Sequence, residues 1–298
     1  MVPPHGGAAW WRVTLGAGPW APARGRRPAR SARRGWRRYR SGVAYWVLKV
    51  LLSPVFYLLW RVRVEGRERV PATGPAILAA NHQSFCDSFF IPLVLPRRVT
   101  YVAKSEYFDA WRTSWFFRAA GQIPMHRGGG DASKRALDTA TEVLQSGGLL
   151  GIYPEGTRSP DHRLHRGHTG VARLAFGCDV PVIPVGLVGT RRIQPPGRRL
   201  MRPFHAVTIR FGPPISTGDL PAELREKGDP EALRALTDRV MAAIASLSGQ
   251  EYVDEYAKRS APPSGPPSVR PSGAPSGPPS GASALDASRH LSATPRSH

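Results

Sequence analysis

The chain has 298 residues, a formal net charge of +21 and two cysteines, Cys86 and Cys178. Two cysteines exclude a disulfide framework and a cysteine-rich metal site, and they are typical of a reducing compartment. Both ends lack the periodic apolar residues that build a core, so we predict one folded domain rather than two. The positive charge suits nucleic acid, an anionic membrane surface or a phosphorylated substrate, and it does not choose among them.

The two ends are predicted to be disordered. Residues 1–42 contain ten arginines and no acidic residue, and residues 251–298 are dominated by Pro, Ser, Gly and Ala from Ala261 onward. No cleavable signal peptide is predicted, because the arm lacks an apolar stretch followed by a cleavage site. Two interpretations of the arm stay open: a polybasic segment on a membrane surface, or a solvated tail or upstream extension from a misplaced start codon.

Residues 43–60 are apolar apart from Lys49 and Ser53, and Pro54 interrupts them. The stretch is barely long enough to cross a hydrocarbon layer of ~30 Å. Arginines flank it on both sides, and aromatic residues lie near its two ends, where they favour lipid headgroups. We predict a kinked helix or helix pair that lies in one leaflet, with a full membrane span or a buried core helix as alternatives.

Residues 61–250 alternate between strands and helices. Strands are expected at 77–80, 99–103, 149–153, 182–187 and 207–211, and helices at 84–95 with Ser84 as N-cap, 110–119, 133–145, 171–176 and 231–247. The three glycines 128–130 are interpreted as a flexible connector. This alternation predicts an α/β fold with a mixed, largely parallel sheet flanked by helices.

The block NHQSFCD, from Asn81 to Asp87, lies where a predicted strand ends and a helix begins. On a regular helix, residues five apart lie roughly 140° apart, so His82 and Asp87 can meet only if His82 precedes the helix. The carboxylate would then hold one ring nitrogen and leave the other free to take a proton from a hydroxyl. The alternative is a helix-capping histidine beside an unrelated aspartate.

A second block, YPEGTRS at residues 153–159, also follows a predicted strand. With these two blocks the chain resembles the phospholipid and glycerol acyltransferase family, of the PlsC-like 1-acyl-glycerol-3-phosphate acyltransferase type. Two further motifs of that family stand in the family's order, GQIPMHR at 121–127 and VPVIPV at 180–185, and the resemblance covers about residues 61–215. Tyr153 stands where the family more often has Phe.

The resemblance implies roles for individual residues. His82 would be the general base and Asp87 its orienting partner. The residues expected to bind the acyl acceptor or its phosphate are Lys104, Arg127, Glu155, Gly156, Thr157 and Arg158. Arginine suits a phosphate because its guanidinium donates two parallel hydrogen bonds. For Glu155 a structural role, accepting bonds from backbone amides of its own turn, stays open.

The activity implied is transfer of a fatty acyl group from acyl-CoA or acyl carrier protein to 1-acyl-glycerol 3-phosphate (lysophosphatidic acid), giving phosphatidic acid for phospholipid biosynthesis. Glycerol 3-phosphate, another lysophospholipid or a glycolipid are alternative acceptors. No metal, no cofactor besides the donor and no nucleic acid partner are expected, and the enzyme would work with membrane lipids on the cytoplasmic face of the cell membrane, as a peripheral or monotopic protein. A non-enzymatic binder of anionic membranes or nucleic acid is the alternative from another class.

Two further features suggest other chemistry only at first sight. His162, His165 and His168 are spaced by three, but no carboxylate or cysteine cluster accompanies them, so we expect a solvated loop. Cys86 lies near His82, and we interpret it as a small side chain on the inner face of the helix rather than a nucleophile.

Overall fold

The computed structural model describes residues 42–104, 122–125 and 129–257, except residues 196, 199 and 227. The predicted helix at 110–119 and the predicted disordered arm therefore lie outside the described residues. The chain divides into two units, Met1–Arg259 and Ser260–His298. All of the described residues belong to the first unit.

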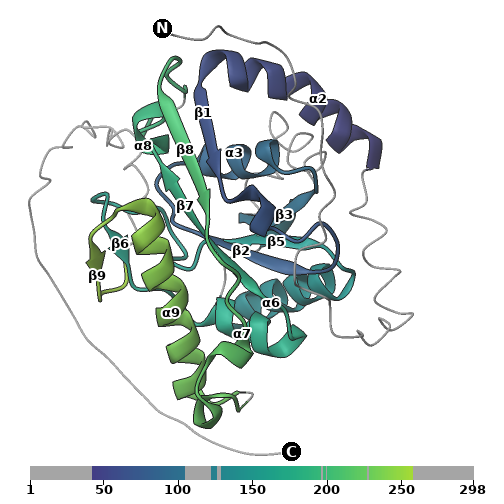
Figure 1. Cartoon of the computed structure of the whole chain (residues 1–298), viewed down its shortest axis with the longest axis vertical. Coiled ribbons are helices and arrows are strands. Elements are labelled where there is room, and N and C mark those ends of the chain that lie inside the picture. The colour runs from purple at the N-terminus through teal and green to yellow at the C-terminus, as the bar shows by residue number, and fades with distance from the viewer. Residues whose placement is uncertain are drawn as a thin grey trace, which may run out of the picture. The chain divides into compact units, whose positions relative to one another are not determined.

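A seven-stranded sheet forms the centre of this unit, with strand order β1-β8-β7-β2-β5-β3-β4 (Figure 1). All neighbouring strands run parallel except β7 and β8, which are antiparallel. The sheet is therefore mixed and largely parallel, as the alternating pattern predicts. The strands are β1 (Arg61–Glu65), β2 (Ala76–Ala80), β3 (Val99–Lys104), β4 (Ile123–Met125), β5 (Leu149–Ile152), β7 (Val182–Val188) and β8 (Ala206–Phe211).

Helices cover both faces of the sheet. Along β2 successive side chains alternate between two hydrophobic clusters, with Ile77 in one and Leu78 in the other, because strand side chains point to opposite faces. Helices α6 (Gly129–Gln145), α7 (Gly170–Cys178) and α9 (Pro230–Ser248) contribute to the first cluster, and α2 (Gly42–Leu59) and α3 (Asp87–Val94) to the second (Figure 1). This three-layer arrangement buries β2 completely on both sides.

Helix α2 is a single helix that contains Pro54, not a helix pair. It packs through aromatic rings: the centroid of the Phe56 ring lies 4.8 Å from that of Trp60 and 5.3 Å from that of Phe90 in α3. Its remaining surface is apolar and exposed, through Val43, Trp46, Val47, Val50, Leu51, Val55, Tyr57 and Leu58. Among the described residues, no helix is long and apolar enough to cross a membrane.

Three predicted boundaries are wrong. Helix α3 begins at Asp87 and not at Ser84, because the Ser84 hydroxyl donates to the carbonyl of Gln194, 2.8 Å away, instead of capping the helix. Helix α6 already begins at Gly129, within the stretch that we interpreted as a flexible connector. Helix α7 continues to Cys178 and ends where Asp179 adopts a left-handed φ of 53°.

The folded part also extends beyond residue 250, where we placed the start of the disordered tail. Strand β9 (Tyr252–Val253) pairs with β6 (Leu164–His165) in a small second sheet, so residues 251–257 belong to the domain. The remaining elements are the short helix α8 (Thr190–Ile193) and the 3-10 turns η1 (Arg67–Arg69), η2 (Thr217–Asp219) and η3 (Ala222–Leu224).

Candidate active site

Three neighbouring parallel strands, β7, β2 and β5, end at the same edge of the sheet. The chain leaves β2 into Asn81 and His82, leaves β5 into the turn at residues 153–159, and leaves β7 into α8. Lys104 is the last residue of β3, which also runs parallel to β5. Ligands of α/β sheets bind at the carboxyl ends of strands, so this edge is the candidate active site.

His82 and Asp87 meet as the sequence predicts, because His82 lies in the loop before α3. Its Nδ1 is 2.9 Å from Asp87 Oδ2, and the carboxylate is completely buried whereas the imidazole is 17% exposed. The carboxylate therefore holds the imidazole by Nδ1 and leaves Nε2, the other ring nitrogen, outside this contact. This is the geometry that the predicted roles of His82 as general base and Asp87 as orienting partner require.

The same oxygen of Asp87 also organises the loop. Oδ2 accepts from the backbone N–H groups of Gln83 and Ser84, at 2.7 and 2.8 Å. Among the described residues, the other oxygen, Oδ1, is buried without a hydrogen-bond partner. Asp87 therefore fixes the imidazole and the backbone beside it through one atom.

The 153–159 turn holds the backbone of His82 on both sides. The N–H of His82 donates to Glu155 Oε1 at 3.0 Å, and its carbonyl accepts from the N–H of Ser159 at 2.8 Å. Glu155 Oε2 accepts from the N–H of His165 at 3.1 Å. Glu155 is 2% exposed, and burial raises its pKa to about 7. Its carboxylate thus binds backbone amides, but those of the loop at His82 and of strand β6 rather than of its own turn. A contact with substrate stays a prediction.

Tyr153 forms one wall of the site. Its ring stacks on His82 with centroids 3.9 Å apart and planes at 11°, and its hydroxyl lies 2.9 Å from Ser88 Oγ. Burial raises the pKa of Tyr153 well above its ordinary value, so the phenol stays neutral. Tyr101 stacks behind Tyr153 and leaves no room for a side chain at Gly151, where a Cβ would lie 2.3 Å from its ring.

Asn81 connects the loop at residues 81–86, which is the candidate catalytic loop, to β7 and to the end of the domain. Its amide bonds both backbone groups of Leu187, at 2.7 and 2.9 Å, and its Nδ2 also donates to Gln250 Oε1 at 2.6 Å. Gln250 in turn donates to the carbonyl of His162. The sequence contains no signal for Gln250, because its partners lie far away along the chain.

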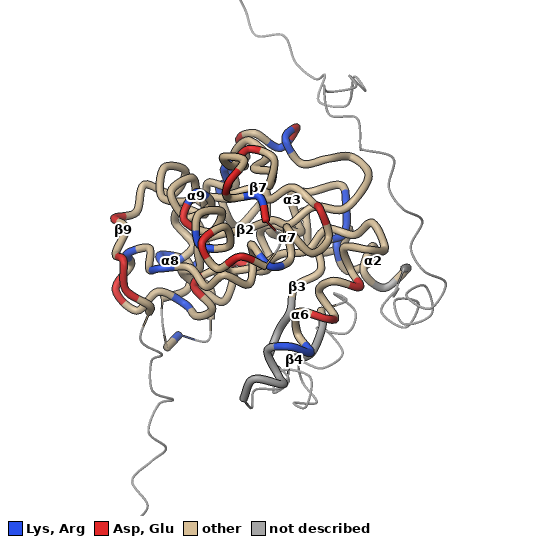
Figure 2. Tube along the Cα trace, turned by 90° about the horizontal axis from the view of Figure 1, so that it is seen from below, with Lys and Arg blue, Asp and Glu red and all other residues tan. Residues whose placement is uncertain are grey.

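Among the predicted phosphate ligands, Arg158 has a side chain that is free to bind a ligand. This side chain is exposed, and it makes no hydrogen bond or ion pair with the described residues. The backbone around it is fixed, because Arg191 of α8 donates to the carbonyls of Ser159 and Pro160, at 3.0 and 2.9 Å. Figure 2 shows the basic residues at α8.

The structure describes the other residues predicted to bind the acceptor in less detail. Gly156 takes a positive φ of 68°, and a Cβ there would lie 3.1 Å from the His168 ring, so both backbone and space favour glycine. Thr157 is partly buried beside it. The backbone of Lys104 ends β3 at the site edge, and Arg127 lies outside the described residues.

The alternative interpretations near the site lose support. Burial raises the pKa of the Cys86 thiol to about 12, and Cys86 Sγ lies 3.2 Å from Ser84 Oγ, so a thiolate nucleophile is disfavoured. Of the three histidines, His162 and His168 are exposed, as expected for a solvated loop, whereas His165 is buried in β6 and bonds Asp161. His162 also bonds Gln83. Within the described part of the chain, no group of three His, Cys, Asp or Glu residues could hold a metal ion.

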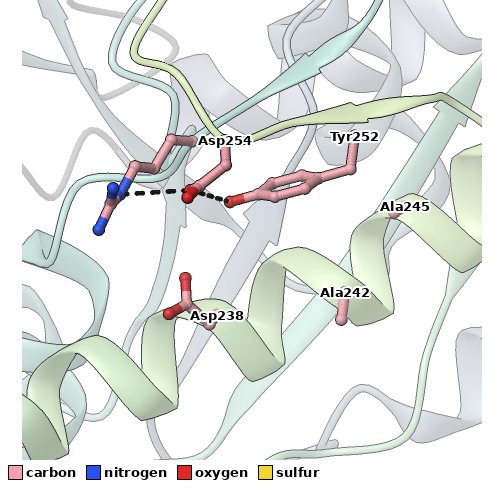
Figure 3. A pocket seen from close by; sticks show the side chains of 6 residues that line it. Asp238, Ala242, Ala245, Tyr252 and Asp254 are labelled. Atoms are coloured by element: carbon pink, nitrogen blue, oxygen red, sulfur yellow. Dashed lines mark hydrogen bonds and ion pairs between the residues drawn. The ribbon is translucent and has the colours of Figure 1, made fainter.

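A pocket between α9 and β9 lies apart from these residues (Figure 3). Its charged and polar groups pair with one another, since Asp254 bonds both Arg166, at 3.5 Å, and the Tyr252 hydroxyl, at 3.3 Å. The other residues that line it are Asp238, Ala242 and Ala245. None of the predicted site residues lines this pocket.

A histidine held by a buried carboxylate and an exposed arginine on the neighbouring turn lie at the strand ends of this α/β sandwich, which is the geometry that a group-transfer site for a hydroxyl substrate with an anionic group would require. Residues 61–188 match the family Acyltransferase. The chain is similar to PlsC-like members of that family.

Three relatives illustrate this similarity. The chain is 31% identical over 160 residues to the chloroplastic 1-acyl-sn-glycerol-3-phosphate acyltransferase LPAT1 of Arabidopsis thaliana, covering 53% of this chain and 45% of that one. It is 28% identical over 205 residues to the Bacillus subtilis 1-acyl-sn-glycerol-3-phosphate acyltransferase, covering 68% and 94%. The crystal structure of the 1-acyl-sn-glycerophosphate (LPA) acyltransferase PlsC from Thermotoga maritima superposes with a TM-score of 0.56 at 26% identity, covering 68% and 79%. The chain spans about half the length of the first curated relatives that it matches.

Proposed function

We propose that the protein transfers a fatty acyl group from a thioester donor, acyl-CoA or acyl carrier protein, to the free hydroxyl of 1-acyl-glycerol 3-phosphate. The product is phosphatidic acid. The observation that carries the proposal is the His82–Asp87 pair at the strand ends, with Nδ1 of His82 2.9 Å from the Asp87 carboxylate and the guanidinium of Arg158 exposed on the neighbouring turn. The names of the relatives in plants and bacteria support the same reaction.

The chemistry is direct transfer. His82 Nε2 removes the proton of the acceptor hydroxyl as that oxygen attacks the thioester carbonyl carbon. The tetrahedral intermediate then expels the thiolate as the carbon–sulfur bond breaks, and the imidazolium returns the proton to sulfur. Asp87 balances the positive charge that His82 carries in between.

Two groups are suited to the negative charges of the substrate. Arg158 is assigned to the phosphate of the acceptor, because a guanidinium binds two phosphate oxygens at once. The backbone N–H groups of Thr157 and Arg158 have no acceptor among the described residues, and they are assigned to the oxyanion of the intermediate. Lys104, the last residue of β3, and Arg127, two positions after β4 along the sequence, are proposed as further phosphate contacts.

The proposed place of action is the cytoplasmic face of the cell membrane. Helix α2 supports it, because its exposed face is apolar and an apolar helix face of this kind inserts into the headgroup region of a leaflet. The acceptor, which carries an acyl chain, is a membrane lipid, so the enzyme would reach it from the surface on which α2 lies.

The test uses the purified full chain with either thioester donor and a panel of acceptors: 1-acyl-glycerol 3-phosphate, glycerol 3-phosphate, 1-acyl-glycerophosphocholine and a glycolipid. Products are identified by mass, and His82→Ala is the inactive reference. We expect phosphatidic acid with wild type and none with His82→Ala. Acylation of another acceptor in preference would assign the enzyme to that substrate instead, and equal activity of His82→Ala would overturn the mechanism.

A further inference from the structure

The loop between α8 and β8, residues 194–205, exposes two large apolar side chains. Leu200 is 83% and Phe204 70% exposed. Among the described residues, every other exposed large apolar side chain lies on α2, apart from Tyr252 and Tyr256 near the end of the domain. Large apolar side chains gathered in one exposed region mark a surface that another apolar phase covers.

The loop and the helix α8 that precedes it are strongly basic. From Thr190 to Phe204 the sequence has five arginines and no acidic residue. Of these, Arg192, Arg198 and Arg202 are exposed and make no ion pair with the described residues. Cations that are left together without counter-charges in the protein are suited to anions outside it, and interspersed apolar side chains distinguish a lipid surface from a soluble anion.

Hydrogen bonds fasten this loop to the end of α2. The indole N–H of Trp60 donates to the carbonyl of Arg202 at 2.7 Å, and the N–H of Phe204 donates to the carbonyl of Leu59 at 2.6 Å. The loop and the helix therefore form one continuous surface. Figure 1 shows the C-terminal end of α2 at the same end of the sheet as the start of β8.

Phe204 holds an uncommon backbone conformation in this position. Its φ is 63°, in the left-handed region that glycine and asparagine adopt readily and aromatic residues rarely adopt. Its side chain gains little from burial within the protein to offset this strain. Strained conformations persist where they serve a function, and here the strain holds an aromatic ring out in solvent.

The loop also borders the active site. The chain passes from β7, which pairs with β2, through α8 into the loop, and Ser84 of the catalytic loop donates to the carbonyl of Gln194. A lipid bilayer in contact with the loop would thus lie beside His82.

We propose that the α8–β8 loop is a second membrane-docking element, which together with α2 seats the catalytic edge on an anionic lipid bilayer. Leu200 and Phe204 enter the boundary between headgroups and acyl chains, and the arginines bind lipid phosphates. The inference rests on the membrane association proposed for α2, and it adds the orientation: the edge that carries His82 faces the bilayer, so that a lysolipid acceptor moves from leaflet to base without crossing water.

The test is sedimentation of the full chain with vesicles of phosphatidylcholine, with or without about 30% phosphatidylglycerol, which needs no catalysis. The apolar variant is Leu200→Ser/Phe204→Asn, in which asparagine suits the left-handed backbone. The charge variant is Arg198→Gln/Arg202→Gln. Its matched control is Arg135→Gln/Arg173→Gln, on exposed positions of α6 and α7 across the sheet from α2. Melting temperatures show that each variant is folded.

We expect the apolar variant to bind vesicles more weakly on the order of tenfold. The charge variant should lose a similar factor on anionic vesicles only, and the control should bind like wild type. Wild-type binding by both loop variants, or no binding by wild type, would overturn the proposal. If the loop variants lose vesicle binding but wild type shows no acyl transfer, the docking surface is supported and only the proposed function is refuted.

Discussion

Replacing Asp87 by asparagine separates its structural role from its catalytic role. The amide oxygen can take the place of Oδ2 and accept the same three hydrogen bonds, from His82, Gln83 and Ser84. The amide NH₂ then occupies the position of Oδ1, which is buried without a partner among the described residues. A buried unpaired donor costs about 1–3 kcal/mol of stability, so Asp87→Asn should fold with a lowered melting temperature. In Asp87→Ala two backbone N–H groups lose their acceptor, and the cost rises to roughly 2–6 kcal/mol.

The catalytic loss in folded Asp87→Asn should be separable from its loss of stability. The neutral amide cannot balance the charge of the His82 imidazolium, and the turnover number should fall by ~10² to 10⁴. The assay is phosphatidic acid formation under saturating donor, beside melting curves. Asp238→Asn is the matched control, because Asp238 is an exposed residue of α9 that pairs with Arg234. A folded Asp87→Asn enzyme that works within tenfold of wild type would refute the assigned role.

Three further changes test other parts of the site. Burial raises the pKa of Glu155 from 4.5 to about 7, so the folded chain binds the carboxyl proton more tightly than the unfolded chain does. The stability that this protonated carboxyl contributes is lost as the pH rises through 7. The stability of wild type relative to Glu155→Gln should therefore fall by roughly 3 kcal/mol between pH 4.5 and 8 in chemical denaturation, and a flat difference would contradict the shifted pKa. Arg158→Ala should lower kcat/KM for the phosphorylated acceptor on the order of 10- to 200-fold, but slow hydrolysis of the donor should change little. The exposed control Arg163→Ala should leave both rates nearly unchanged. An equal loss of donor hydrolysis in Arg158→Ala would mean that Arg158 supports the turn. Deleting residues 261–298 should leave turnover intact, whereas deleting residues 250–298 should reduce it, because only the longer deletion removes Gln250 and β9. Equal activity of the two proteins would show that the contacts of Gln250 and β9 are dispensable.

The sequence predicts the features that depend on neighbouring residues. Alternating strands and helices determine the mixed, largely parallel sheet, and the five-residue spacing of His82 and Asp87 suffices to bring them together once His82 is placed before α3. The motif at 153–159 is placed correctly for the same reason, since the strand before it fixes the edge at which it lies.

Contacts between distant segments are beyond such reasoning. The bond from Asn81 to Gln250 spans 169 positions, and nothing in either local pattern indicates it. Glu155 illustrates the same limit: its turn suggests a local backbone acceptor, but the amides that it accepts belong to His82 and His165, which only the tertiary fold brings near. The helix start at Ser84 fails because a distant carbonyl, that of Gln194, competes for the hydroxyl.

The position of β1 at the edge of the sheet sets the order in which the protein can assemble on the ribosome. Its register partners in β8 come late, since Glu65 and Arg210 are 145 positions apart. During synthesis, α2 and β1 therefore emerge long before β8, the strand with which β1 pairs. The aromatic side chains of α2 likewise cannot pack until Phe90 has been synthesised. On the proposed membrane association, the apolar helix would be free to meet a membrane first, and the domain would fold afterwards beside the lipid proposed as its substrate. The contact between Asn81 and Gln250 would form last, after Gln250 has left the exit tunnel.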